Sequence, residues 1–268
     1  MIAVAPASED AFKGNMVTGE ESVRLIPAAV AGLILIGVAS SAGRSIYPDS
    51  FASRMEPVRS ALLRARGSLD PGAAQRPFMV ARVDERFGDN RLVTYVHVVL
   101  GSVFLLLAPI QFSARLRRQH PGVHRWTGRV LVVTGLAVAI AGLFFGVFIP
   151  FAGAAERVVV GVFGGTVIGA LITAVLAIRR GEVERHRAWM IRAFSLMLGI
   201  STVRIVAAVL DFVLAPLAYS TETIFVASLW LGWGGTLATA ELWLRLAASR
   251  TPQGRVAGSA VSLWTSRP

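Results

Sequence analysis

The sequence has no cysteine and little charge. Only 16% of its 268 residues are charged, whereas 54% are hydrophobic, and the mean hydropathy is +0.61. Without cysteine the chain cannot form disulfides, use a thiol as a nucleophile or bind a metal through thiolates. Lysine is nearly absent too, because all but one of the 27 basic residues are arginine, which we interpret as a coding bias. This composition is typical of an integral membrane protein.

Six apolar segments are long enough to cross a bilayer as helices, which takes about 20 residues each. They lie at residues 24–43, 92–114, 126–149, 157–178, 188–214 and 222–246. The sequence therefore predicts an all-α integral membrane protein, a bundle of six transmembrane helices with one extramembrane segment between the first two. We interpret the first span as an uncleaved anchor, since the segment before it is acidic rather than basic.

The net charge of +11 comes mainly from arginines in short loops beside the spans, a pattern of membrane orientation, so no nucleic-acid partner is expected. On this topology 16 basic residues lie on the side of both termini and ten on the other side. The chain is then predicted to lie in a bacterial inner membrane, with the lipid bilayer as its partner. Residues 1–23 and 248–268 are expected to be cytoplasmic and 44–91 extracytoplasmic, and 92–247 are expected to form a five-helix core.

Reporter fusions test this topology. Fusions near Ala73 and near Gln119 should report opposite sides of the membrane, because the span 92–114 separates them. The same side for both would remove a span.

The segment 44–91 carries nine arginines and six acidic residues. Phe51, Met55, Val58 and Leu62 recur at helical spacing, which favours an amphipathic helix on the membrane surface. A solvated linker with turns at 71, 72 and 77 is an equal alternative.

Polar residues inside the spans follow helical stripes. In the second span the stripe is His97, Gly101, Phe104, Ala108 and Gln111, which should face the bundle because polar groups facing lipid are costly. In the fourth span the repeated glycines 161, 165 and 169 predict a face that packs tightly on another helix.

Arg204 makes the fifth span unusual, because an arginine at mid-membrane costs about 2.5 to 3.5 kcal/mol on insertion scales. We expect this span to be central and Arg204 to be hydrogen-bonded across helices, to Tyr95 or His97. By the same depth argument Arg192 should approach Glu241.

A His-Arg-Trp pattern opens two spans: His124-Arg125-Trp126 with Arg129, and His186-Arg187-Ala188-Trp189 with Arg192. A single helical hairpin separates the copies, so both lie on one membrane side. Either they form one site, with Gln111 on its wall, or each anchors a helix at an anionic interface.

These motifs carry a resemblance. The run from His97 through Ala108-Pro109-Ile110-Gln111-Phe112 to the first His-Arg-Trp turn, then the second turn and Thr202-Val203-Arg204, resembles the bacterial multi-pass membrane family catalogued as domain of unknown function 2306. The resemblance covers about residues 92–210 and implies a membrane protein with no settled activity.

Three functions remain open. The favoured one is a noncatalytic accessory or structural subunit of a membrane complex, with other membrane subunits as partners and an interfacial His/Arg site. The second is a redox protein binding a quinone or haem b, with His186 and His124 or His120 as axial ligands. The third is a transporter. No catalytic residue is assigned, and the candidate ligand or cofactor residues are His97, Gln111, His120, His124, Arg125, Arg129, His186, Arg187, Arg192 and Arg204.

Overall fold

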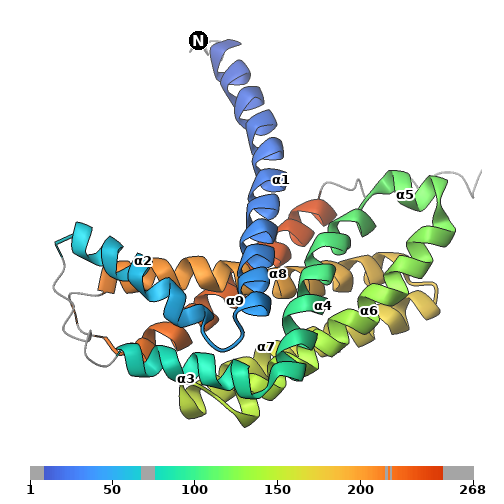
Figure 1. Ribbon diagram of the computed structural model, residues 1–268. Helices are drawn as coiled ribbons and strands as arrows, with labels where there is room; N and C mark the ends of the chain where they lie inside the picture. The colour runs from blue at the N-terminus through green and yellow to red at the C-terminus, as the bar shows by residue number, and fades with distance from the viewer. Residues whose placement is uncertain (1–8, 68–75, 215–216, 218, 250–268) are drawn as a thin grey trace, which may run out of the picture.

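The computed structural model describes residues 9–67, 76–214, 217 and 219–249. Within these residues the chain forms helices and no strand, which confirms the all-α prediction (Figure 1). The helices are α1 (Glu9–Ile46), α2 (Phe51–Ala65), α3 (Arg76–Asp89), α4 (Arg91–Gln111), α5 (Ala114–Gln119), α6 (Pro121–Leu143), α7 (Gly153–Arg179), α8 (Val183–Leu214) and α9 (Thr221–Ser249). A π-helical turn, η1 (Phe144–Phe148), extends α6.

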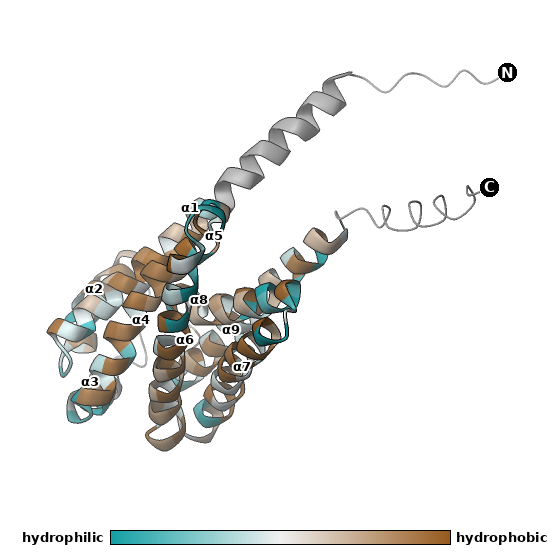
Figure 2. Cartoon of the chain, turned by 90° about the vertical axis from the view of Figure 1, so that its right-hand side faces the viewer, coloured by the Kyte–Doolittle hydropathy of each residue, from teal (hydrophilic) through white to brown (hydrophobic). Residues whose placement is uncertain are grey.

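Six of the described helical segments are long and apolar enough to cross a membrane, as predicted. They are Pro27–Ile46, Arg91–Gln111, Pro121–Phe148, Gly153–Arg179, Val183–Leu214 and Thr221–Ser249. Helices suit this environment because they satisfy every backbone hydrogen bond internally. Figure 2 shows hydrophobic colour along α6 and α7 and hydrophilic colour gathered at α5 and at helix ends.

The loop expected before the third span is largely helical. Ser113 caps α5 by accepting a hydrogen bond from the Leu116 N–H at 3.3 Å. Pro121 then occupies the first turn of α6, where its missing N–H costs nothing. Helix α6 therefore begins several residues before the predicted start at 126, and His124 and Arg125 lie on its first turns.

The fifth span, α8, is central, as predicted. It packs against α1, α4, α7 and α9, and residues of α7, α8 and α9 form the main buried core. Figure 1 shows the C-terminal part of α1 beside α4 and α8, while its N-terminal part stands clear of the other helices. Helices α8 and α9 are in close contact at Gly232, which lies directly against the backbone of Val203.

Within the described residues, the glycine stripe of α7 packs on no other helix of this chain, so the prediction of such a contact is wrong. A Cβ built at Gly161, Gly165 or Gly169 would meet no described atom within 4 Å. The face of α7 that is buried carries alanine and larger side chains instead, among them Ala170 and Ala174. Alanine is small enough for close packing, and the glycines are left on the open side of the helix.

The segment between the first two spans contains two helices, α2 and α3, so the linker alternative is wrong for residues 51–65 and 76–89. The expected turn at 71 and 72 lies outside the described residues, and Pro77 lies within α3. On α2 the apolar side chains of Met55, Val58 and Leu62 are exposed. Arg59, on another face of α2, pairs with Asp211 at the end of α8 through bonds of 2.5 and 2.9 Å. This arrangement fits the amphipathic helix predicted from the sequence.

Candidate functional site in a cavity between the spans

A cavity of about 440 Å³ lies among the spanning helices. Its wall comes from α1, α4, α6, α7, α8 and α9, and α2 and α3 contribute Phe51, Ala52, Val83, Arg86 and Phe87. Most lining side chains are apolar, and the charged ones are Arg44, Arg86, Glu156 and Arg204. Pockets of about 300 to 1,000 Å³ with a few placed polar groups are the usual form of a small-molecule site.

Arg204 differs from the other arginines of this wall because it forms no ion pair with a described residue. Its Nη1 atom is buried, and no described residue accepts a hydrogen bond from it. The prediction of a bond to Tyr95 or His97 is therefore wrong. Tyr95 is 40% exposed, and His97 lines the same cavity but uses Nδ1 for the carbonyl oxygen of Val138 on α6, at 3.0 Å.

The other two arginines of the wall are each paired. Arg86 on α3 lies 2.9 Å from Glu156 on α7, which is only 2% exposed and also accepts the Ala152 N–H at 2.7 Å. Arg44 at the end of α1 lies 2.7 Å from Asp84 on α3. These pairs attach α3 to two spanning helices.

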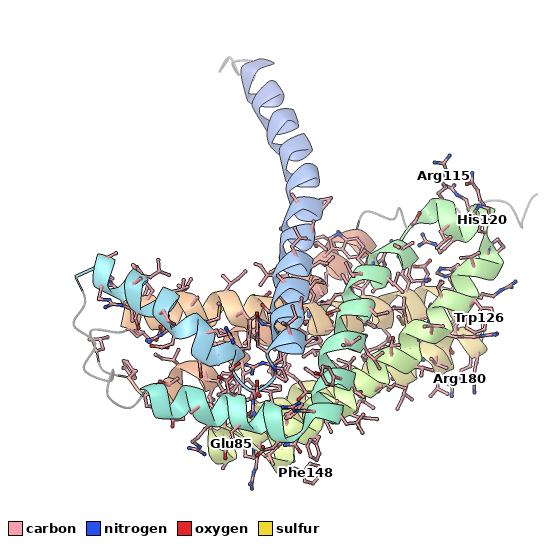
Figure 3. The ribbon with its side chains drawn as sticks, in the orientation of Figure 1. Glu85, Arg115, His120, Trp126, Phe148 and Arg180 are labelled. Carbon is pink, nitrogen blue, oxygen red and sulfur yellow. The ribbon has the colours of Figure 1, made fainter. Side chains whose placement is uncertain are left out.

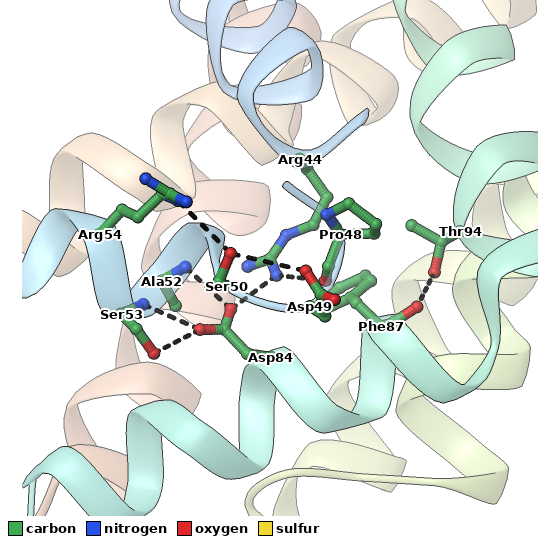
Figure 4. A network of polar contacts seen from close by, with 10 residues as sticks. All are labelled: Arg44, Pro48, Asp49, Ser50, Ala52, Ser53, Arg54, Asp84, Phe87 and Thr94. Atoms are coloured by element: carbon green, nitrogen blue, oxygen red, sulfur yellow. Dashed lines mark hydrogen bonds and ion pairs between the residues drawn. The ribbon is translucent and has the colours of Figure 1, made fainter. Parts of the chain in front are cut away.

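Asp84 is the centre of the polar network that closes this end of the bundle (Figure 4). One carboxylate oxygen accepts the Ala52 N–H at 2.8 Å as well as Arg44, and the other accepts the Ser53 N–H at 2.8 Å and the Ser53 hydroxyl at 2.6 Å. Burial alone would raise the pKa of Asp84, but the bonds from Ser53, Ala52 and Arg44 favour the carboxylate and hold the pKa below its usual value.

Sequence reasoning missed Asp84, because no local pattern marks it. Its partners lie 31 to 40 residues earlier in the chain. Only the presence of an acidic residue among many arginines in the segment 44–91 hinted at a pair.

His97 faces the bundle, as its stripe predicted. Phe104 and Ala108 on that stripe are 1% and 5% exposed. The His97 ring lies edge-on to Phe145 of η1. Since the Val138 carbonyl can only accept, Nδ1 of His97 carries the proton, and in the neutral ring Nε2 is then an acceptor.

A second polar group lies at the opposite end of α4. Gln111 donates its amide to the Thr127 hydroxyl on α6, while Gln111 Oε1 and His124 Nδ1 are buried without a described partner. His186 on α8 donates from Nδ1 to the Ala174 carbonyl of α7 at 2.9 Å, and His124 and His186 are near enough to interact electrostatically. The two His-Arg-Trp turns thus bring their histidines within electrostatic range of each other.

The remaining predicted residues do not join this group. Figure 3 shows His120 and Trp126 pointing outward at the α5 end, and Trp126 is 68% exposed. The other exposed members are Arg125, Arg129 and Arg187.

Arg192 pairs with Glu241 on α9 through bonds of 2.5 and 2.9 Å, which confirms that prediction. Its guanidinium also lies 4.7 Å from the centre of the Trp189 ring. Trp189 and Arg192 of the second turn are therefore half-buried, whereas Trp126 and Arg129 of the first turn are exposed, so the copies are alike in sequence and different in structure.

Comparison with protein families shows which family the chain belongs to. Residues 94–244, more than half of the chain, match the family model described as predicted membrane protein DUF2306. The chain belongs to this family. No curated protein and no solved structure matches it. The DUF2306 region spans α4 to α9 and so includes His97, Arg204 and the histidines of both turns, whereas Arg44 and Asp84 lie outside it.

Proposed function

We propose that this multi-pass membrane protein is noncatalytic and binds a small molecule in the cavity beside Arg204. The observation that carries the proposal is the buried Nη1 of Arg204, which no described group satisfies. A buried charge without a partner costs several kcal/mol of folding free energy, so a protein retains one where another interaction offsets that cost. A bound ligand with a hydrogen-bond acceptor supplies such an interaction.

An accessory role in a larger membrane complex is compatible with this ligand site. The bare backbone face formed by Gly161, Gly165 and Gly169 supports it, because small residues allow the helix of another subunit to approach closely.

The test is to replace Arg204 with methionine, which has similar length and no charge. In the ligand-free protein this change should raise the free energy of unfolding by about 1 to 3 kcal/mol, since an unpaired buried charge is removed. Native mass spectra in neutral detergent should show a bound small molecule in the wild type and none in Arg204→Met.

Arg157→Met is the matched control, because Arg157 is exposed near the start of α7, and it should keep both the ligand and the wild-type stability. Destabilisation by Arg204→Met with unchanged ligand masses would show that Arg204 is a structural residue. The same spectra test the accessory role, since a partner subunit adds a protein-sized mass.

A second candidate is a b-type haem held by His124 and His186. It is favoured by the electrostatic interaction of the two side chains and by the Nδ1 bond of His186 to a backbone carbonyl, which fixes the ring as in many metal-binding histidines. The purified protein should then show a Soret band that His124→Ala and His186→Ala each abolish, while His120→Ala, at an exposed position, keeps it. A colourless protein made with ample haem would exclude this candidate.

A further inference from the structure

The charge balance of the cavity wall specifies the charge of its ligand. Of the three arginines that line it, Arg44 is paired with Asp84 and Arg86 with Glu156. Glu156 is also held by a backbone N–H, so it is not free to turn toward Arg204. Within the described residues the wall therefore carries one positive charge in excess.

Among the described residues, the wall atoms that are buried without a hydrogen-bond partner are donors. Arg204 Nη1 and Arg86 Nε are both buried without an acceptor among the described residues. Arginine cannot accept a hydrogen bond, and bonds from it to an anionic oxygen are about twice as strong as neutral ones. The complementary headgroup is one that carries several acceptor oxygens.

The rest of the wall is apolar and suits a hydrocarbon chain. Apolar side chains from α7, α8 and α9 surround the space, namely Phe163, Leu196, Met197, Phe225, Leu229 and Trp233. A small inorganic anion would leave this surface empty, whereas a neutral hydrocarbon or a quinone would leave the charge of Arg204 unbalanced. A ligand that satisfies both parts has a charged head and an apolar chain.

We propose that the cavity binds an amphipathic anion, an alkyl chain that ends in a carboxylate or a phosphate, with the headgroup on Arg204. This inference rests on the proposed function and adds the chemical class of the ligand. A free fatty acid and an alkyl phosphate lipid share the required chemistry. They differ in the number of acceptor oxygens that the headgroup offers.

The experiment compares probes of equal chain length on the full-length protein in neutral detergent. Palmitate and hexadecyl phosphate are compared with hexadecanol, with decylubiquinone, and with acetate and inorganic phosphate, by calorimetric titration. At least one long-chain anion should bind wild type about ten to a hundred times more tightly than hexadecanol. The better of the two anions identifies the headgroup, and acetate and inorganic phosphate should bind weakly because they lack the chain.

Variants link the selectivity to Arg204. In Arg204→Met the affinity for the anion should fall to that for hexadecanol, whereas Arg204→Lys, which keeps the charge, should retain part of the preference, and Arg157→Met should equal wild type. Circular dichroism and a monodisperse gel-filtration peak identify variants that fold.

Two outcomes overturn the inference in different ways. If hexadecanol or decylubiquinone binds wild type as tightly as the anions do, the cavity is a ligand site but not one for an anion. If no probe binds and native mass spectra show no bound small molecule, the proposed function fails as well, and the cavity holds water alone.

Discussion

Asp84→Asn should lower the free energy of unfolding by about 3 to 5 kcal/mol, because it leaves the buried guanidinium of Arg44 without its counter-charge. Asp84 is 2% exposed and Arg44 is 7% exposed, so water cannot replace the lost carboxylate. The asparagine amide would also turn a donor toward groups that now donate to Asp84, the N–H and hydroxyl of Ser53 or the N–H of Ala52. Thermal unfolding in detergent measures the loss.

Glu85→Gln is the control, since Glu85 is the exposed neighbour of Asp84, as Figure 3 also shows, and its change should shift stability by less than about 0.5 kcal/mol. Equal effects of the two substitutions would contradict the structural importance of the network.

Acid should cause the same loss of stability as Asp84→Asn, because it protonates the Asp84 carboxylate. A carboxylate whose folded pKa is depressed contributes stability above its unfolded pKa of about 3.9, and this contribution disappears as the pH falls through the lower folded value. The protection factors of amides in α2 and α3, which are corrected for the intrinsic pH dependence of exchange, should therefore fall in that pH range in wild type. In Asp84→Asn they should already be low at neutral pH.

Gly232→Ala should have the second large effect, because α8 and α9 touch through backbone at this point. A Cβ at Gly232 would lie 2.7 Å from both the Cα and the N of Val203, and no rotamer change can relieve a clash with main chain. Overpacking commonly costs about 1 to 3 kcal/mol, and we expect the upper end here because two helices must separate. The shift in unfolding temperature measures it.

Gly165→Ala is the matched comparison. The same methyl group at Gly165 meets nothing within 4 Å, and alanine is a better helix former than glycine by about 1 kcal/mol. This variant should be as stable as wild type or more so. Equal destabilisation by both variants would show that glycine is needed in α7 for a contact outside this chain.

The sequence was sufficient for the parts of the fold that repeat along one helix. Six apolar segments gave six spans, and the stripe of His97, Phe104 and Ala108 gave the buried face of α4, because periodicity within a helix is local information. The pair of Arg192 and Glu241 followed from equal depth in adjacent spans.

What the sequence could not supply was the choice of partners across helices. His97 binds the backbone oxygen of Val138, and an acceptor of this kind has no signature in residue type. The prediction that the glycines of α7 pack on a neighbouring helix was wrong for the same reason. Small residues indicate that a helix face can pack closely, but they do not show that another helix lies against it. The isolation of Arg204 therefore became visible only once all the helices were placed.

The ion pairs of α3 also have a kinetic consequence. Val83, Arg86 and Phe87 of α3 form part of the cavity wall, and α3 is held by Asp84 to α1 and by Arg86 to α7. A molecule that leaves past α3 must wait until both buried pairs have opened, which is a local unfolding event. Along this route the residence time of a ligand is set by how often α3 detaches, so affinity and exchange rate can change independently.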